Sequence, residues 1–134
     1  MNYAELHCKS NFSFLQGASS AEQLVRRAVR LGYTALAITD RNTLAGVVRG
    51  HGASADAELQ YIVAAELTFG DAPPCVVWIR NRSAYASLCR LLTLGRRQAS
   101  KGNCCLSFED LVSHGVVFIL VVIPDWNRLS TGTA

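Results

Sequence analysis

Short apolar runs alternate with amphipathic segments along most of this chain, and this alternation limits the folds that are open to it. Apolar runs of strand length cover residues 3–7, 33–39, 60–67, 75–80 and 116–123. Between them, the spacing of apolar side chains predicts helices over residues 20–31, 43–54, 83–97 and 107–113. Strands that alternate with helices are typical of an α/β fold, here with about five mostly parallel strands and helices between them.

Two serine-led patterns predict where helices begin. Ser19 is followed three residues later by Glu22, and Ser107 is followed at the same spacing by Asp110. At this spacing the serine hydroxyl and the acidic side chain cap each other's backbone N–H groups. We therefore expect the first helix to start after Ser19 and the last one to start after Ser107.

The composition is that of a globular domain. Hydrophobic residues make up 50% and charged residues 17% of the 134 residues, which is enough apolar surface for a core. No apolar run approaches the roughly 18 residues of a membrane helix, and the N-terminus lacks the basic and apolar regions of a signal peptide. We therefore expect one domain or less, located in the cytoplasm, with no membrane partner.

Cysteine content and charge give only weak indications of function. The five cysteines are an odd number without a Cys-x-x-Cys pair, so free thiols are expected rather than disulfides or structural zinc. The net charge of +3 is too small to indicate nucleic-acid binding by itself. Two basic groups, within residues 26–30 and 96–101, favour a solvated helix face over a DNA contact, and both interpretations stay open.

Three of the predicted strands end in a polar side chain that can bind a metal ion, namely His7, Asp40 and Glu66. In parallel α/β folds the carboxyl ends of the strands share one edge, where functional groups gather. Each residue also has a plain structural interpretation, because an Asp after a strand is usually a turn former. From the pattern alone, one shared site and three unrelated structural roles are equally acceptable.

A family resemblance separates these alternatives. Residues 3–19, which read YAELHCKSNFSFLQGAS, resemble the opening of the PHP domain of bacterial error-prone DNA polymerases, which are similar to the alpha subunit of DNA polymerase III. Residues 35–41 (ALAITDR) with 44–49 (LAGVVR) resemble the second PHP motif, and residues 62–66 (IVAAE) resemble the segment that supplies an acidic metal ligand. The resemblance continues in order to about residue 111.

PHP domains of this kind resemble a distorted barrel of seven β/α units, and active members hydrolyse phosphoesters with up to three metal ions. Their first motif has the form H-x-H-x-x-x-S, whereas this chain has His7, Lys9 and Ser13 at those positions. Their second motif reads Thr-Asp-His, whereas this chain has Arg41 after Asp40. Two imidazole ligands of the family are therefore replaced by cations.

These replacements decide the expected chemistry. Lys and Arg are protonated at neutral pH and have no lone pair for a metal ion. Both cations can instead form charge-assisted hydrogen bonds with Asp40 and Glu66. We therefore expect no bound metal, no cofactor and no catalytic residue, and ion pairs at these degenerate metal-site positions. The alternative is that Lys9 and Arg41 point into solvent, but buried carboxylates need a counter-charge.

The resemblance implies an N-terminal PHP-domain fragment, with residues 1–123 forming a partial barrel and residues 124–134 an irregular tail. The later ligands of the family have no counterpart in this sequence, so a truncated, non-catalytic scaffold is expected. Its partner would be the remainder of a polymerase that makes DNA with Mg²⁺ in damage tolerance and repair, and DNA would be contacted only through that parent. Open strand edges favour self-association of the fragment. Alternative interpretations are a stand-alone metal-dependent phosphoesterase and an interaction module without catalytic descent.

Overall fold

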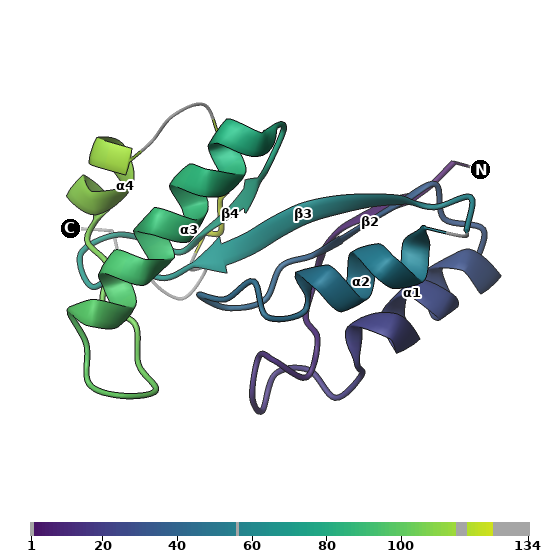
Figure 1. The fold of residues 1–134 in the computed structure, drawn as a ribbon, viewed down its shortest axis with the longest axis horizontal. Coiled ribbons are helices and arrows are strands. Elements are labelled where there is room, and N and C mark those ends of the chain that lie inside the picture. Colours follow the sequence, from purple (N-terminus) through teal and green to yellow (C-terminus); the bar gives the residue numbers. More distant parts are fainter. Residues whose placement is uncertain (1, 56, 115–117, 125–134) are drawn as a thin grey trace, which may run out of the picture.

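A computed structural model describes residues 2–55, 57–114 and 118–124 of the chain. Strands and helices follow one another in the predicted order (Figure 1). The elements are β1 (Ala4–Cys8), α1 (Ala21–Arg30), β2 (Ala35–Ile38), α2 (Val47–Ser54), β3 (Gln60–Leu67), β4 (Cys75–Trp78), α3 (Arg82–Arg97), α4 (Phe108–His114) and β5 (Ile119–Val122). Each overlaps the segment predicted for it, while the predicted tail lies outside the described residues from position 125 onward.

The five strands form one mixed sheet in chain order. β1 pairs with β2 and β2 with β3 in parallel, but β3 pairs with β4 and β4 with β5 antiparallel. The prediction of a mostly parallel sheet is therefore wrong for the second half. β3 ends at Leu67 and β4 begins at Cys75. That connection is too short for the crossover of about a dozen residues that a parallel pair needs.

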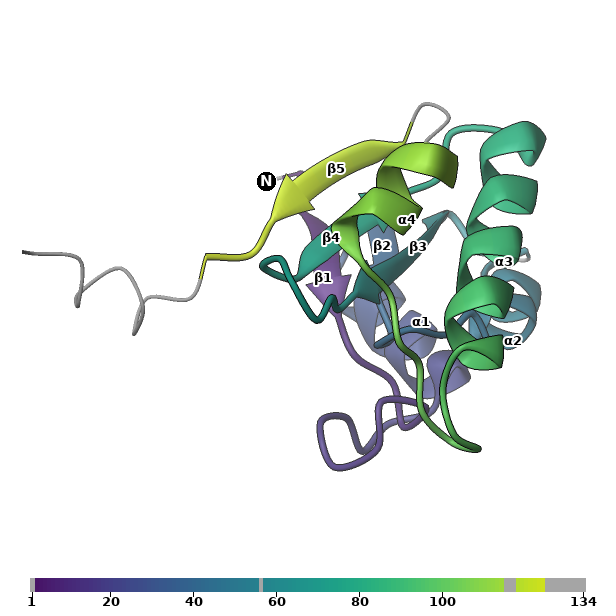
Figure 2. The same cartoon turned by 90° about the vertical axis from the view of Figure 1, so that its left-hand side faces the viewer.

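The sheet is curled rather than flat (Figure 2). The clearest sign is a hydrogen bond across the curve, in which the Trp78 indole N–H of β4 donates to the Leu6 carbonyl of β1 over 3.0 Å. These two strands are separated by β2 and β3 in the sheet order. The sheet is therefore a half-barrel, which confirms the predicted partial, distorted β/α barrel.

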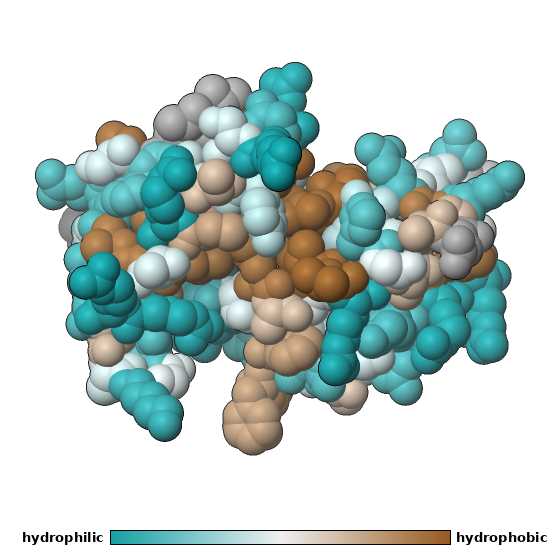
Figure 3. Space-filling model, viewed as in Figure 1, coloured by the Kyte–Doolittle hydropathy of each residue, from teal (hydrophilic) through white to brown (hydrophobic). Residues whose placement is uncertain are grey.

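Two apolar clusters hold the helices on this sheet. One joins α1 to β2, and all four residues of β2 are buried, as expected for a strand covered on both sides. The other joins α3 and α4 to β3 and β4. Figure 3 shows apolar residues gathered near the middle of the view, between α3 and α2, with hydrophilic residues on the outer surfaces. Burial raises the pKa of the Cys75 thiol in the second cluster to about 11, and all five cysteines are free, as predicted.

The N-termini of two helices differ from the sequence prediction. Ser20 and Gln23, not Ser19 and Glu22, cap α1, with the Gln23 side chain accepting from the Ser20 N–H over 2.8 Å. The predicted second helix begins four residues late, at Val47, after a turn rather than a side-chain cap. For α4 the predicted cap is confirmed, since the Ser107 N–H donates to Asp110 over 2.9 Å and the Asp110 N–H donates back over 3.1 Å.

The strand β5 is an exposed apolar edge of the sheet, and we expect the chain to self-associate through it. All four of its residues are exposed, Val121 by 50%. β5 pairs only with β4 among the described residues, so its outer backbone groups are available to another strand. A lysine on an edge strand blocks such pairing. Light scattering across a concentration series should show mass rising for the wild type, and a constant monomer mass for Val121→Lys.

A matched control places the same charge elsewhere. Val48 is 79% exposed on α2, so Val48→Lys should associate like the wild type. A wild-type chain that stays monomeric at high micromolar concentration would contradict the prediction. So would equal association of both lysine variants.

Among the described residues, no helix is long and apolar enough to cross a membrane.

Candidate functional site

The polar residues predicted from the strand ends lie at one edge of the sheet. His7 belongs to β1 and Lys9 follows it directly, while Glu66 lies near the end of β3. β2 lies between these two strands, and just beyond it the backbones of Arg41 and Glu66 form a parallel bridge. Asp40 joins the same edge through its carbonyl, which accepts from the Glu66 N–H over 3.1 Å.

Glu66 is the centre of the first cluster of side chains. Its Oε2 atom lies 2.9 Å from Nε2 of His7 and 2.7 Å from Nζ of Lys9. Burial alone raises the pKa of the Glu66 carboxyl, but hydrogen bonds and positive charge from Lys9 and His7 outweigh it and lower that pKa. Glu66 is therefore an ionised carboxylate held between a lysine and a histidine.

Lys9 is a buried member of this cluster. Its ammonium nitrogen is buried, and apart from the contact with Glu66 it has no hydrogen-bond acceptor among the described residues. A buried ammonium group without a counter-charge is strongly disfavoured. The pair is therefore mutual: Glu66 neutralises Lys9 and Lys9 neutralises Glu66, as expected for this position.

Asp40 has different partners from those predicted. It is only 2% exposed, and the neighbours of its carboxylate are serines rather than cations. Oδ1 accepts the Ser10 N–H over 2.8 Å and the Ser13 hydroxyl over 2.7 Å, and Oδ2 accepts the Ser10 hydroxyl over 2.6 Å. The expectation that Lys9 or Arg41 neutralises Asp40 is wrong, because three hydrogen bonds satisfy the carboxylate instead.

Ser10 was missed by sequence reasoning, and Ser13 was assigned only by its motif position. A signal for both was present, because a Ser-x-x-Ser spacing directly after a strand places two hydroxyls on one turn. That turn forms here, with the Ser13 N–H donating to the Ser10 carbonyl over 3.0 Å. Asp40 therefore anchors the loop after β1 through hydrogen bonds and does not act as a charged group at a metal site.

The Arg41 side chain follows the alternative interpretation. Only its backbone joins the site, through the bridge to Glu66 and an N–H that donates to the Ser13 hydroxyl over 3.0 Å. Its guanidinium is exposed and makes no ion pair within the described part of the chain, and it borders a cavity instead. Of the five predicted positions, the side chains of His7, Lys9 and Glu66 meet, and those of Asp40 and Arg41 do not join them.

The residues present do not fit a metal ion. Within the described ranges, no group of three or more His, Cys, Asp or Glu side chains could hold one. Glu66 and His7 are two possible donors, but the Lys9 ammonium lies on the carboxylate oxygen that a cation would need. Lys9 is a fixed positive charge that repels a divalent ion. The chemistry this cluster supports is structural ion pairing.

Comparison with known proteins identifies related sequences. Residues 5–115 match the family model of the PHP domain. The chain is 53% identical over 123 residues to the error-prone DNA polymerase of Rhodopirellula baltica, covering 92% of this chain and 11% of that protein. The identity to the error-prone DNA polymerase of Pseudomonas aeruginosa is also 53%, covering 92% of this chain and 12% of that protein. The chain therefore spans about a tenth of the length of these relatives.

Solved structures show the same fold at lower sequence identity. An amidohydrolase from Chromobacterium violaceum superposes with a TM-score of 0.58 at 20% identity, covering 70% of this chain and 33% of that one. A protein from Bifidobacterium adolescentis, provisionally named a metal-dependent phosphoesterase, gives 0.55 at 20% identity over 84% of this chain and 43% of that one. These likenesses support the partial barrel and say nothing about activity.

Proposed function

The chain belongs to the PHP domain family, and on that premise we propose that it serves as a metal-free, non-catalytic scaffold within an error-prone DNA polymerase. The identity of about half to such polymerases along 92% of the chain supports this assignment. In this proposal, Mg²⁺-dependent DNA synthesis for damage tolerance and repair belongs to the rest of the polymerase. That remainder is also the partner of this chain.

The observation that carries the proposal is the contact between Lys9 and Glu66. Lys9 stands where the family motif has a second histidine, and its ammonium lies 2.7 Å from the Glu66 carboxylate. It supplies, as part of the protein, the positive charge that a metal ion supplies in active members. A covalently attached cation fixes the strand ends without any metal supply, which suits a scaffold and not a phosphoesterase.

The alternative function, a stand-alone metal-dependent phosphoesterase, has less support. It needs several metal donors with free lone pairs at one site. In this chain the Asp40 carboxylate already accepts three hydrogen bonds from serines, and Arg41 offers no lone pair. The proposal therefore assigns none of these residues a catalytic role.

Metal content tests the proposal directly. The chain is purified without chelator, and zinc and manganese are measured by mass spectrometry. We expect far less than one metal ion per chain, because Lys9 already neutralises Glu66. Stoichiometric metal that is lost in Glu66→Gln would overturn the proposal, because metal would then be held by the same carboxylate.

A double variant tests whether restoring the two ligand types is enough to give hydrolysis. Lys9→His with Arg41→His restores the family's ligand types at both positions. We expect it to hydrolyse a generic phosphodiester no faster than a His7→Ala variant, because Asp40 remains bound to the loop serines. Hydrolysis clearly above that of His7→Ala would favour the phosphoesterase alternative.

A further inference from the structure

The two border strands of the sheet differ in how their outer edges are protected. β5 is the last strand in the sheet order, and Figure 2 shows it along the border of the curled sheet. Residues 118–124, which contain β5, carry no charged side chain, and their one proline lies after the strand. The register of β5 with β4 has no bulge. Charges, prolines and bulges are the features that keep edge strands from pairing, and β5 has none of them within its length.

The outward backbone groups of β5 follow from its pairing with β4. The Ile123 N–H donates to the Pro74 carbonyl over 2.8 Å, so Ile123 bonds toward β4. Hydrogen-bonded and non-hydrogen-bonded residues alternate along an antiparallel pair. Val121 therefore also bonds toward β4. The backbone groups of Leu120 and Val122 point the other way, toward the open side of the sheet.

The outer edge of β1, at the other border of the sheet, is closed by side chains. The Leu6 carbonyl accepts the Trp78 indole N–H over 3.0 Å, and the His7 N–H donates to the Glu5 carboxylate over 3.1 Å. The register with β2 also shifts between Glu5 and Cys8, as it does at a β-bulge. A bulge, a charge and two occupied backbone groups leave β1 unsuited to a further strand.

The open edge of β5 matches the same edge of a second copy. A twofold axis normal to the sheet makes the two strands antiparallel and gives a closed, self-complementary contact. If the axis passes at Val121, Leu120 lies opposite Val122 on both sides, and all four outward backbone groups form hydrogen bonds. An axis at Leu120 would instead pair Val122 with Phe118, which precedes the strand. An axis at Val122 would pair Leu120 with Pro124, which has no N–H.

We propose that this chain forms a closed dimer in which β5 pairs antiparallel with β5 of a second copy about Val121, while the capped edge of β1 stops growth at two chains. Because β5 carries no charge, the axis brings no like charges together. Leu120 and Val122, 38% and 52% exposed, lie opposite Val77 and Cys75 of the apolar cluster under α3 and α4. The dimer covers them and extends that apolar layer across the axis. The inference uses only the two sheet edges and does not rest on the proposed function.

Cysteine cross-linking tests the register. Val121→Cys and Ile119→Cys each add one thiol to the same face of β5, at side chains that are 50% and 49% exposed. In the proposed dimer Val121 faces its own copy as a non-hydrogen-bonded pair, with a Cα separation of about 4.5 Å that a disulfide can span. Ile119 faces Ile123 instead and lies four residues, roughly 13 Å along the strand, from its own copy.

Mild oxidation followed by a non-reducing gel measures the cross-link. We expect about tenfold more disulfide-linked dimer for Val121→Cys than for Ile119→Cys, because only the first pair is within disulfide reach. The wild type, run alongside, gives the background from its five free cysteines. Equal cross-linking of the two variants would overturn the proposal.

Sedimentation equilibrium across a concentration series tests whether growth stops at two chains. The wild-type mass should rise to that of two chains and no further. Leu6→Lys places a charge on β1, where Leu6 is 42% exposed, and should dimerise like the wild type. Trp78→Phe with Glu5→Ala removes both side-chain caps of β1, so its mass should pass beyond two chains. Adding Leu6→Lys to that double variant should return the mass to two chains.

Four results would contradict the proposal. They are a wild-type chain that stays monomeric, a wild-type chain that grows past two, loss of the dimer in Leu6→Lys, and a folded double variant that stops at two chains. Circular dichroism checks that each variant folds. The cross-linking ratio and the wild-type mass decide the question without the double variant.

Discussion

Replacing Asp40 by alanine is expected to lower the free energy of unfolding by about 4 kcal/mol, a large share of a small domain's stability. Three hydrogen bonds end on this buried carboxylate, two from hydroxyls and one from a backbone N–H. In the variant these donors lose their acceptor while Ser10 stays buried, and each unsatisfied buried group costs about 1–3 kcal/mol. Urea denaturation of the purified chain measures the effect as a lower midpoint.

Asp40→Asn and Glu109→Ala complete the experiment. Asparagine keeps one carbonyl acceptor, so its cost should be about half that of alanine. Glu109 is exposed on α4, and its removal should change stability by no more than about 0.5 kcal/mol. An Asp40→Ala variant as stable as Glu109→Ala would mean that the serine hydrogen bonds do not anchor the loop.

The strand and helix order could be predicted from the sequence because each element carries its own local signal. β2 is an example, since its unbroken apolar run leads directly to its burial on both sides. The sheet direction needed one further step, since the short connection between Leu67 and Cys75 already excluded a parallel crossover. Alternation of strands and helices indicates a parallel sheet only where each connection is long enough.

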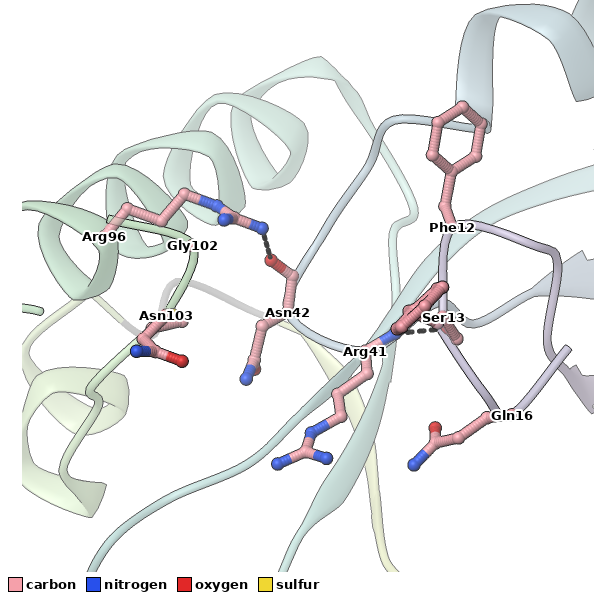
Figure 4. A pocket seen from close by; sticks show the side chains of 10 residues that line it. Phe12, Ser13, Gln16, Arg41, Asn42, Arg96, Gly102 and Asn103 are labelled. Atoms are coloured by element: carbon pink, nitrogen blue, oxygen red, sulfur yellow. Dashed lines mark hydrogen bonds between the residues drawn. The ribbon is translucent and has the colours of Figure 1, made fainter. Parts of the chain in front are cut away.

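The site could be predicted only in part, because ligand positions do not determine side-chain directions. The strand ends placed Glu66 and Lys9 together correctly, since the parallel strands β1, β2 and β3 end at one edge of the sheet. The role of Asp40 depended on where the loop after β1 folds back, thirty residues earlier in the chain, and no periodicity reports that. The Arg41 guanidinium likewise borders a cavity (Figure 4) instead of joining Glu66, and no periodicity reports that side-chain direction.

A second large loss of folding stability is expected when Lys9 is replaced. Lys9→Met keeps the length of the side chain but removes its charge. The Glu66 carboxylate then loses one of its two partners, although Glu66 is only 9% exposed. Removing one member of a buried pair costs about 3 kcal/mol, because the other charge stays buried without compensation. Lys9→Arg keeps the charge and should lose far less. The exposed pair of Arg49 with Glu22, 3.8 Å apart, is a matched control whose loss should cost under about 1 kcal/mol.

A double-mutant cycle and its pH dependence show whether the pair acts as a unit. Lys9→Met with Glu66→Leu should be more stable than Lys9→Met alone, because two apolar side chains leave no unpaired charge. The pKa of Glu66 is lowered in the folded wild type, so its contribution is present above the ordinary carboxyl range and lost as the pH falls through the lowered value. Without Lys9, its hydrogen bond and positive charge no longer lower the pKa of the Glu66 carboxyl, so the carboxyl takes up its proton at higher pH than in the wild type. The stability gap between wild type and Lys9→Met should therefore be widest near neutral pH and narrow in acid. A gap that stays constant with pH in urea titrations would mean that Lys9 contributes packing alone.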